Sequence, residues 1–362
     1  MRIFMKSLLL AATMIPMIYA LAQDTDDQIK DLQAQIQEIR VMAESRQVGA
    51  QSPAGYPKIE DAVGLRFELG GLYQNAVLDG TEYAELVKYD TDSYFCESTY
   101  HDTQVIRPQA KMGWGVDGAI SYYFQDHGYE IKLRNSYYDL SISSYLASSS
   151  EKYIYPVSYL GACNNATLSK YAHNKLDITY DLLGLELQKS FFVNRYFSID
   201  AVGGLLASWT WFTSSTKYTE LNFNDEYPNP DSTLDVNKNS SWFGIGPELG
   251  FNLNFTICQG FSLFFNNVGA LMYGRYDLKN YQEFFLEAGT FQDTNRDSQH
   301  SILPYVQSFM GLAYEFYLGH DSHFLKIRAG YNTQYFFAVN RMYNTNSDLQ
   351  TQGLKFDLAW SF

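Results

Sequence analysis

The sequence lacks the features typical of nucleic-acid-binding proteins and of helical membrane proteins. Charged residues make up only 18 % of its 362 residues, and acidic residues outnumber basic ones by 40 to 26. The formal net charge of −14 argues against a nucleic-acid partner, because phosphate binding requires a basic surface. After the first 22 residues, no apolar run approaches the length of a transmembrane helix.

Catalytic and metal-binding motifs are also missing. The sequence contains no H-E-x-x-H, no G-x-S-x-G and no closely spaced set of cysteines and histidines. The segment "HDSH" at 320–323 holds two of the six histidines, but a solvated turn explains it better than a metal site. We therefore expect neither an enzyme nor a bound metal or cofactor.

The first 60 residues differ from the rest. Arg2 and Lys6 precede an apolar run that ends in "ALA", which predicts a signal peptide over 1–22. An anchoring helix fits less well, because Pro16 interrupts a run that is already short. Residues 23–48 carry apolar residues at spacings of 3 and 4, typical of a short helix, and 49–60 form a linker. This helix is either a coiled coil that joins protomers or an amphipathic helix on the barrel or membrane surface.

The sequence is rich in aromatic residues and in stretches where apolar and polar residues alternate. Aromatic residues make up 17 %, with 30 tyrosines and 25 phenylalanines. In "GLKFDLAWSF" at 353–362, every second residue from Leu354 to Phe362 is apolar, and the residues between are small or polar. Alternation of period two predicts a strand with one oily face and one polar face. Ten such stretches follow residue 61, near 62–73, 109–125, 129–143, 175–191, 195–213, 241–257, 260–276, 302–318, 322–338 and 352–362.

The gaps between these stretches alternate in length. Short turns such as "QDHG" and "GHD" alternate with long gaps near 74–108, 144–174, 214–240, 277–301 and 339–351. Aromatic residues gather near the strand ends, as with Trp209, Trp211 and Trp360. A soluble β-sandwich would alternate but would show neither feature. We therefore predict an all-β fold, a closed antiparallel transmembrane β-barrel of about ten strands (10–12) over 61–362, in the outer membrane of a Gram-negative bacterium.

Several segments resemble a known family. "FGIGPELGFNLNF" (243–255), "LFFNNVGALMYGRYDL" (263–278), "DLLGLELQKSFFVNRYFSIDAVGGLLASW" (181–209), "LKIRAGYNTQYF" (325–336) and the final "GLKFDLAWSF" are similar to strands of the major outer membrane proteins of Legionella and of MOMP-like proteins of environmental Chlamydiae relatives. The resemblance implies a porin-like or structural outer-membrane barrel, sometimes adhesive, with no catalytic residues. The chain has only three cysteines, fewer than the cysteine-rich chlamydial major protein. This low number argues against an extensive disulfide-linked coat.

If the apolar residues of each strand face lipid, the polar residues that alternate with them should line the lumen. This polar set carries six basic and seven acidic residues: Arg66, Glu68, Asp117, Glu130, Lys132, Arg134, Glu186, Asp200, Glu248, Lys326, Arg328, Lys355 and Asp357. A ten-stranded barrel lies near the size that side chains can fill, so these charges either pair across the lumen or line a narrow wet passage. Likewise, Lys132, Arg134, Lys326 and Arg328 either form an anion-attracting wall or pair with Glu130, Glu186 or Glu248.

The three cysteines and the last residue add further expectations. Cys96 and Cys163 fall in long loops on one side of the membrane, so a loop-to-loop disulfide and free thiols are both open. Cys258 falls in a short periplasmic turn, too far from either to pair with it. The aromatic Phe362 should be the signal that the outer-membrane assembly machinery reads.

Two functions fit these patterns. The first is a porin-like barrel that passes small solutes or ions passively, and whose helix at 23–48 is a route to homo-oligomers. The alternative is a structural or adhesive surface barrel with a closed lumen. It would contact host or surface ligands through long loops rich in Tyr, Ser and Asn, such as 141–160.

Overall fold

The computed structural model describes residues 64–88, 101–124, 128–149, 152–157, 168–194, 196–222, 229–258, 260–286, 289–318, 323–341 and 347–362. The expected signal peptide, the helix at 23–48 and the linker lie outside these residues, as do Cys96 and Cys163. No helix in the described part of the chain is long and apolar enough to cross a membrane.

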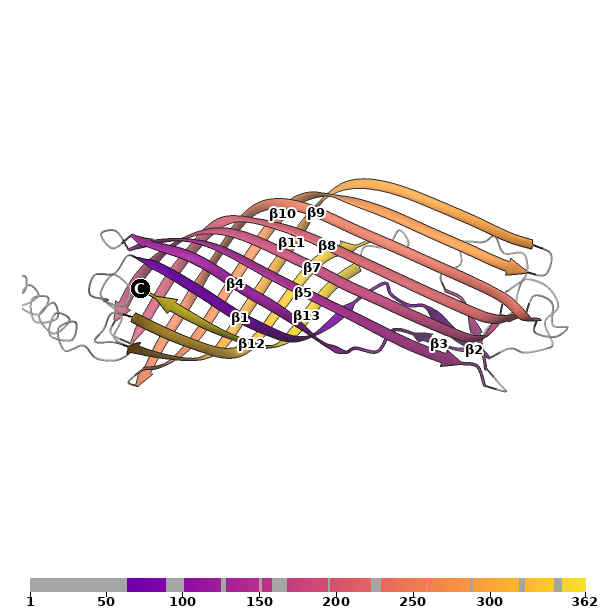
Figure 1. Ribbon diagram of the computed structural model, residues 1–362, viewed down its shortest axis with the longest axis horizontal. Coiled ribbons are helices and arrows are strands. Elements are labelled where there is room, and N and C mark those ends of the chain that lie inside the picture. Colours follow the sequence, from indigo (N-terminus) through magenta and orange to yellow (C-terminus); the bar gives the residue numbers. More distant parts are fainter. Residues whose placement is uncertain are drawn as a thin grey trace, which may run out of the picture.

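Ten strands close into an antiparallel ring, and each corresponds to one of the ten predicted stretches (Figure 1). Because β1 pairs with both β13 and β4, and β7 pairs with β8, the ring has no open edge along its paired length. The ring strands are β1 (Leu65–Leu78), β4 (Met112–Phe124), β5 (Tyr129–Ala147), β7 (Leu168–Asn194), β8 (Phe197–Asn222), β9 (Asn229–Cys258), β10 (Phe261–Leu286), β11 (Gly289–Leu318), β12 (His323–Asn340) and β13 (Ser347–Ser361).

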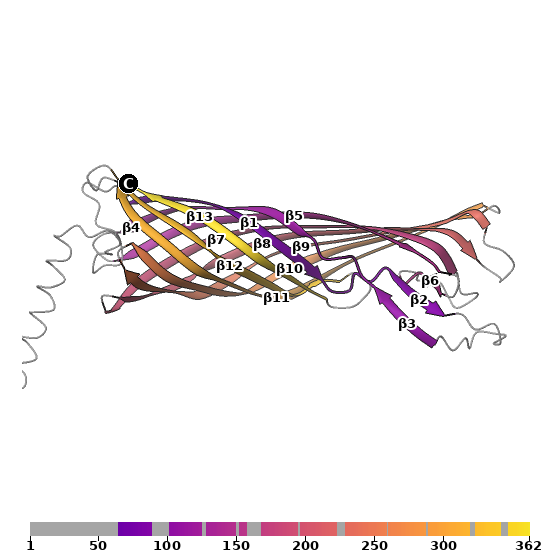
Figure 2. The ribbon, with the colours of Figure 1, turned by 90° about the horizontal axis from the view of Figure 1, so that it is seen from below.

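Three short strands lie outside the ring. They are β2 (Ala84–Lys88), β3 (His101–Ile106) and β6 (Lys152–Tyr155). They pair with one another, and β6 also pairs with β7. They therefore add a small sheet at the long-loop end and do not widen the barrel (Figure 2).

The long connections are shorter than the sequence suggested, because several strands continue far past the apolar band. In the gap expected at 277–301, β10 continues to Leu286 and β11 begins at Gly289, with the two strands paired throughout, and most of 214–240 belongs to β8 and β9. Here the outward residues become polar, as with Asn237 and Asn239, because water replaces lipid. The resulting extension carries the long strands well beyond the short β12 and β13 (Figure 1).

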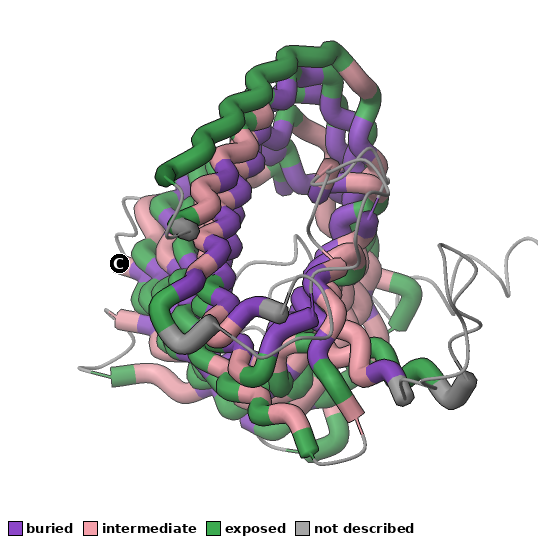
Figure 3. The backbone as a smooth tube through the Cα atoms, turned by 90° about the vertical axis from the view of Figure 1, so that its right-hand side faces the viewer, coloured by how far each residue is buried: buried purple, intermediate pink, exposed green. Residues whose placement is uncertain are grey.

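The outward face of the barrel is an apolar band bordered by aromatic residues. Leu249 and Leu69 are 73 % and 68 % exposed, which on the outside of a closed barrel is typical of side chains that face lipid. At the short-turn border lie Tyr122, Phe124, Tyr129 and Trp360, and at the loop-side border lie Trp114, Trp211, Phe243 and Tyr273. Buried residues lie on the inner side of the wall (Figure 3).

Candidate functional site: the lumen of the barrel

The inward charges gather in the half of the barrel nearest the short turns. Eleven of the thirteen residues predicted to line the lumen surround one polar cavity of about 140 Å³. The two others, Glu248 and Asp357, are buried and bind members of that set. Asn252, Asn254 and Asn266 line the same cavity and are uncharged. The cavity is thus lined by polar groups contributed from every side of the ring.

Glu68 on β1 collects three cations. Its carboxylate lies 2.6 Å from the Lys132 ammonium, 3.1 Å from Arg66 and 3.1 Å from Arg328. The cations come from β5, β1 and β12, so a single buried carboxylate ties three ring strands together. A buried carboxylate is stable only when nearby cations compensate its negative charge, and here three cations do so.

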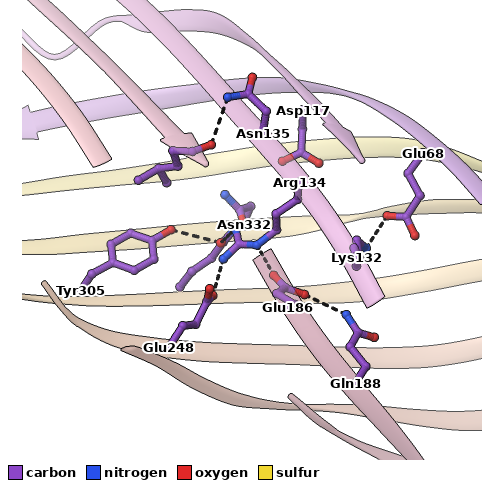
Figure 4. A network of polar contacts seen from close by, with 12 residues as sticks. Glu68, Asp117, Lys132, Arg134, Asn135, Glu186, Gln188, Glu248, Tyr305 and Asn332 are labelled. Carbon is purple, nitrogen blue, oxygen red and sulfur yellow. Dashed lines mark hydrogen bonds and ion pairs between the residues drawn. The ribbon is translucent and has the colours of Figure 1, made fainter. Parts of the chain in front are cut away.

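Arg134 on β5 reaches across the lumen (Figure 4). Its guanidinium forms ion pairs with Glu186 on β7 and Glu248 on β9, and donates to Gln307 on β11 at 3.3 Å. Gln188 also donates to Glu186, at 2.8 Å. In the ring order, β11 is five strands from β5 in either direction, so the contact with Gln307 joins opposite walls.

The remaining inward cations are paired too. Arg328 contacts Asp357 at 2.5 Å, Lys355 contacts Asp117 at 2.8 Å, and Lys326 contacts Glu315 at 2.6 Å. The sequence left two alternatives for Lys132, Arg134, Lys326 and Arg328: an anion-attracting wall, or ion pairs with inward carboxylates. The structure shows ion pairs. The expected partner is found only for Arg134, whereas Lys132 binds Glu68 in place of Glu130, Glu186 or Glu248. Glu130 and Asp200 line the cavity on β5 and β8.

Toward the long loops, the charged layer gives way to an apolar one. A continuous cluster of buried side chains draws on nine of the ten ring strands. At its centre, Tyr138 stacks on Tyr180 with centroids 5.2 Å apart, and Phe336 lies 5.4 Å from Tyr180 and 4.7 Å from Tyr305. The strand without a member, β4, presents Gly113, where a side chain would meet the Tyr138 hydroxyl. Aromatic rings from several walls therefore meet inside the barrel.

Polar contacts hold these rings in place. The Tyr138 hydroxyl donates to the carbonyl of Gln74 at 2.8 Å, and the Tyr180 hydroxyl to the Gln74 side chain at 3.4 Å. The Tyr305 hydroxyl donates to Gln307 at 3.1 Å, which links the aromatic layer to the charged layer. Sequence reasoning missed Glu315, Gln307 and these tyrosines. The alternation of the strands places each of these residues on the inward face. It does not give the position of each one along the barrel axis, which decides what it contacts.

A buried lysine lies still farther toward the long loops. Lys238 on β9 is 1 % exposed, and its outward neighbours Asn237 and Asn239 show that this level is above the lipid. The side chains of Asn174, Ser214 and Thr216 form hydrogen bonds on the adjoining strands. Burial lowers the pKa of Lys238 from its ordinary value of 10.5 to about 6.

Comparison with known proteins fits this architecture. Residues 60–362 match the family described as Legionella pneumophila major outer membrane protein precursor. The chain belongs to this family. Members are outer-membrane proteins, so the barrel described above is an outer-membrane β-barrel, and the apolar band is its lipid-facing surface. No curated protein matches the chain.

Some solved structures share weak similarity with the chain. The outer membrane protease OmpT from Escherichia coli shares 10 % identity at a TM-score of 0.41, over 85 % of this chain and all of that one. A Pseudomonas aeruginosa FadL homologue shares 11 % at 0.28, over 86 % and 92 %. The P. putida toluene transporter TodX shares 8 % at 0.22, over 87 % and 98 %. None of these similarities carries a conclusion about function.

Proposed function

We propose that this family member acts as a structural and adhesive surface barrel whose lumen is closed. The observation that carries the proposal is the contact between Tyr180 and Phe336, whose strands lie on opposite sides of the ring. The layer of ion pairs around Glu68 and Arg134 supports it, because compensated charges leave little free electrostatic attraction for a passing ion.

The surface role is assigned to the loop-side extension. There a second apolar cluster, which includes Tyr83, Ile154 and Leu234, joins β2, β3 and β6 to the long strands. A rigid, paired platform of this kind holds its exposed residues in a fixed arrangement, which lowers the entropic cost of binding a surface ligand. The occupant would be a protein or carbohydrate on a host or neighbouring surface.

Passive transport of small solutes or ions is the second candidate. The polar cavity on the short-turn side, with Asn252, Asn254 and Asn266 in its lining, favours it. In that case the aromatic layer would have to move aside for each solute. The same barrel would then be a narrow porin in which Lys326 and Arg328 influence ion selectivity.

Single-channel conductance in a planar bilayer separates the two. The protein without residues 1–22 is expected to insert and remain electrically silent. Reproducible conductance steps, with a selectivity that changes in a Lys326→Gln/Arg328→Gln variant, would favour the porin and contradict the closed lumen. Insertion is checked independently by the heat-dependent shift in electrophoretic migration that folded barrels show.

The remaining expectations stay part of the proposal. It assigns no catalytic activity and no cofactor. Phe362, whose ring stacks on Phe67 at 5.7 Å, is proposed as the signal for the assembly machinery. Residues 23–48 are proposed to join protomers, and for Cys96 and Cys163 a disulfide and free thiols both stay open.

A further inference from the structure

The β10–β11 hairpin carries a cluster of basic side chains just beyond the lipid-facing band. The continuous apolar run on the outward face of these strands ends at Tyr273 and Ile302, which are 60 % and 62 % exposed, and large apolar residues are exposed again only near the tip, at Phe285 and Phe291. The outward positions beyond Tyr273 and Ile302 hold a group that we call the basic patch: Arg275, Lys279, Arg296 and His300. In the antiparallel pairing, Arg275 is opposite His300 and Lys279 is opposite Arg296, so all four lie on one face of the hairpin.

The positive charge of the basic patch is only partly compensated. Asp277 lies between the two rows and pairs with Arg275 at 2.8 Å. Within the described residues, no ion pair joins Lys279 or Arg296 to an acid. The adjoining outward residues of β9, such as Asn239, are neutral. Like charges placed directly opposite each other destabilise a sheet, so this arrangement calls for an anion from elsewhere.

The basic patch begins at the edge of the lipid-facing band and continues along the hairpin away from it. The ring of Tyr273, at the edge of the apolar band, stacks on His300 with centroids 6.0 Å apart, so the patch begins where the hydrocarbon ends. Pairing between β11 and β12 begins only at Tyr305, which leaves the hairpin uncovered on that side (Figure 1). With the short turns in the periplasm, this end of the barrel faces the outer leaflet.

We propose that the basic patch binds the phosphate groups of a lipid in the outer leaflet, with Lys279 and Arg296 holding one phosphate between them. The guanidinium of Arg296 presents donors in a planar fork, and the ammonium of Lys279 supplies a second point charge. The binding is local, since the whole chain has a net charge of −14. On the opposite wall, the outward Asp139, Asp177 and Asp181 would repel the same headgroup.

The test compares two double variants of equal charge change. Lys279→Gln/Arg296→Gln removes the two uncompensated cations of the basic patch. Lys175→Gln/Lys217→Gln removes two exposed cations on β7 and β8, outside the basic patch, where each already lies near an acid, at 2.9 Å from Asp177 and 3.7 Å from Asp235. Binding of diphosphorylated lipid A to the full-length protein in neutral micelles is measured by native mass spectrometry, and folding is checked by heat-dependent migration.

We expect the first variant to bind lipid A roughly ten- to thirty-fold more weakly than the wild type, and the second to bind within about two-fold of it. An equal loss in both variants would reduce the effect to net charge and overturn the proposal. Full displacement of lipid A by millimolar inorganic phosphate would overturn its assignment to lipid. Because the readout is binding, it does not depend on whether the lumen conducts.

Discussion

The ring of Tyr180 lies 5.4 Å from the ring of Phe336, although β7 and β12 are five strands apart in either direction around the barrel. Two aromatic side chains therefore span the lumen where a wider barrel would hold water. In a ten-stranded ring the interior is narrow enough for large side chains from opposite walls to touch. The proposal of a closed route through the lumen rests on this contact.

Removing both rings should open that route. A Tyr180→Ala/Phe336→Ala variant is expected to show single-channel steps in a planar bilayer, where the proposal expects the wild type to be silent. The matched control is Phe251→Ala/Phe265→Ala, because these rings are also in contact, at 5.9 Å, but face lipid. Conductance equal in both variants, or a folded lumen variant that stays silent, would show that the aromatic layer is not the barrier.

The sequence predicted the ring because lipid on one side and lumen on the other impose opposite polarities on alternate residues. All ten strands were found on this basis. Beyond the lipid the polarity reverses, so that Leu234 and Val236 face inward and Asp235 and Asn237 face outward. Apolar residues therefore change from the outward to the inward parity at that point, so the alternation predicts a loop where β9 continues as a strand.

Inward placement could be predicted, whereas the partners of each inward residue could not. Arg134 binds Glu248, which is 114 residues away in the sequence, because both lie at the same height in the ring. That height depends on the stagger between strands, which is a property of the closed ring and not of any one strand. The expected pairing of Lys132 with Glu130, Glu186 or Glu248 was wrong for this reason, since Glu68 lies at its level.

Loss of Arg134 should be costly for stability. An Arg134→Met variant leaves Glu186 and Glu248 buried without their cation, and we expect a loss of about 3–5 kcal/mol in the free energy of unfolding. A Lys175→Met variant breaks the exposed pair with Asp177 and should cost less than about 1 kcal/mol. Denaturant titration in detergent micelles measures both. Similar losses for the two variants would contradict the buried network.

Lys238 should make stability rise with pH. Its pKa is about 6 in the folded protein and near 10.5 when the chain unfolds, so between these values only the unfolded state binds the proton. The free energy of unfolding should therefore increase by up to about 1.4 kcal/mol per pH unit in this window. A Lys238→Met variant should lose this slope, and a Lys217→Met variant at an exposed site should keep it. Equal slopes in all three proteins would refute the assignment.

Close strand contact should make Gly246 intolerant of a side chain. A methyl group at this inward position of β9 would overlap the carbonyl oxygen of Leu271 on β10. We expect Gly246→Ala to lose about 1–3 kcal/mol and to refold poorly into micelles, measured as the heat-modifiable fraction. Gly71→Ala is the control, because nothing lies within 4 Å of its added carbon. Equal refolding of both variants would show that β9 and β10 separate readily.

Labelling of Cys258 offers a direct test of which end of the barrel faces the periplasm. This cysteine is exposed and lies at the end of β9, in a short turn that the topology assigns to the periplasm. With Cys96 and Cys163 changed to serine, a membrane-impermeant maleimide should label Cys258 only after the outer membrane is permeabilised. A Ser298→Cys variant that also lacks Cys258 should be labelled in intact cells, since Ser298 is exposed on the β10–β11 hairpin beside the basic patch. The reverse pattern would invert the barrel, and would place the basic patch in the periplasm, where no outer-leaflet phosphate could reach it.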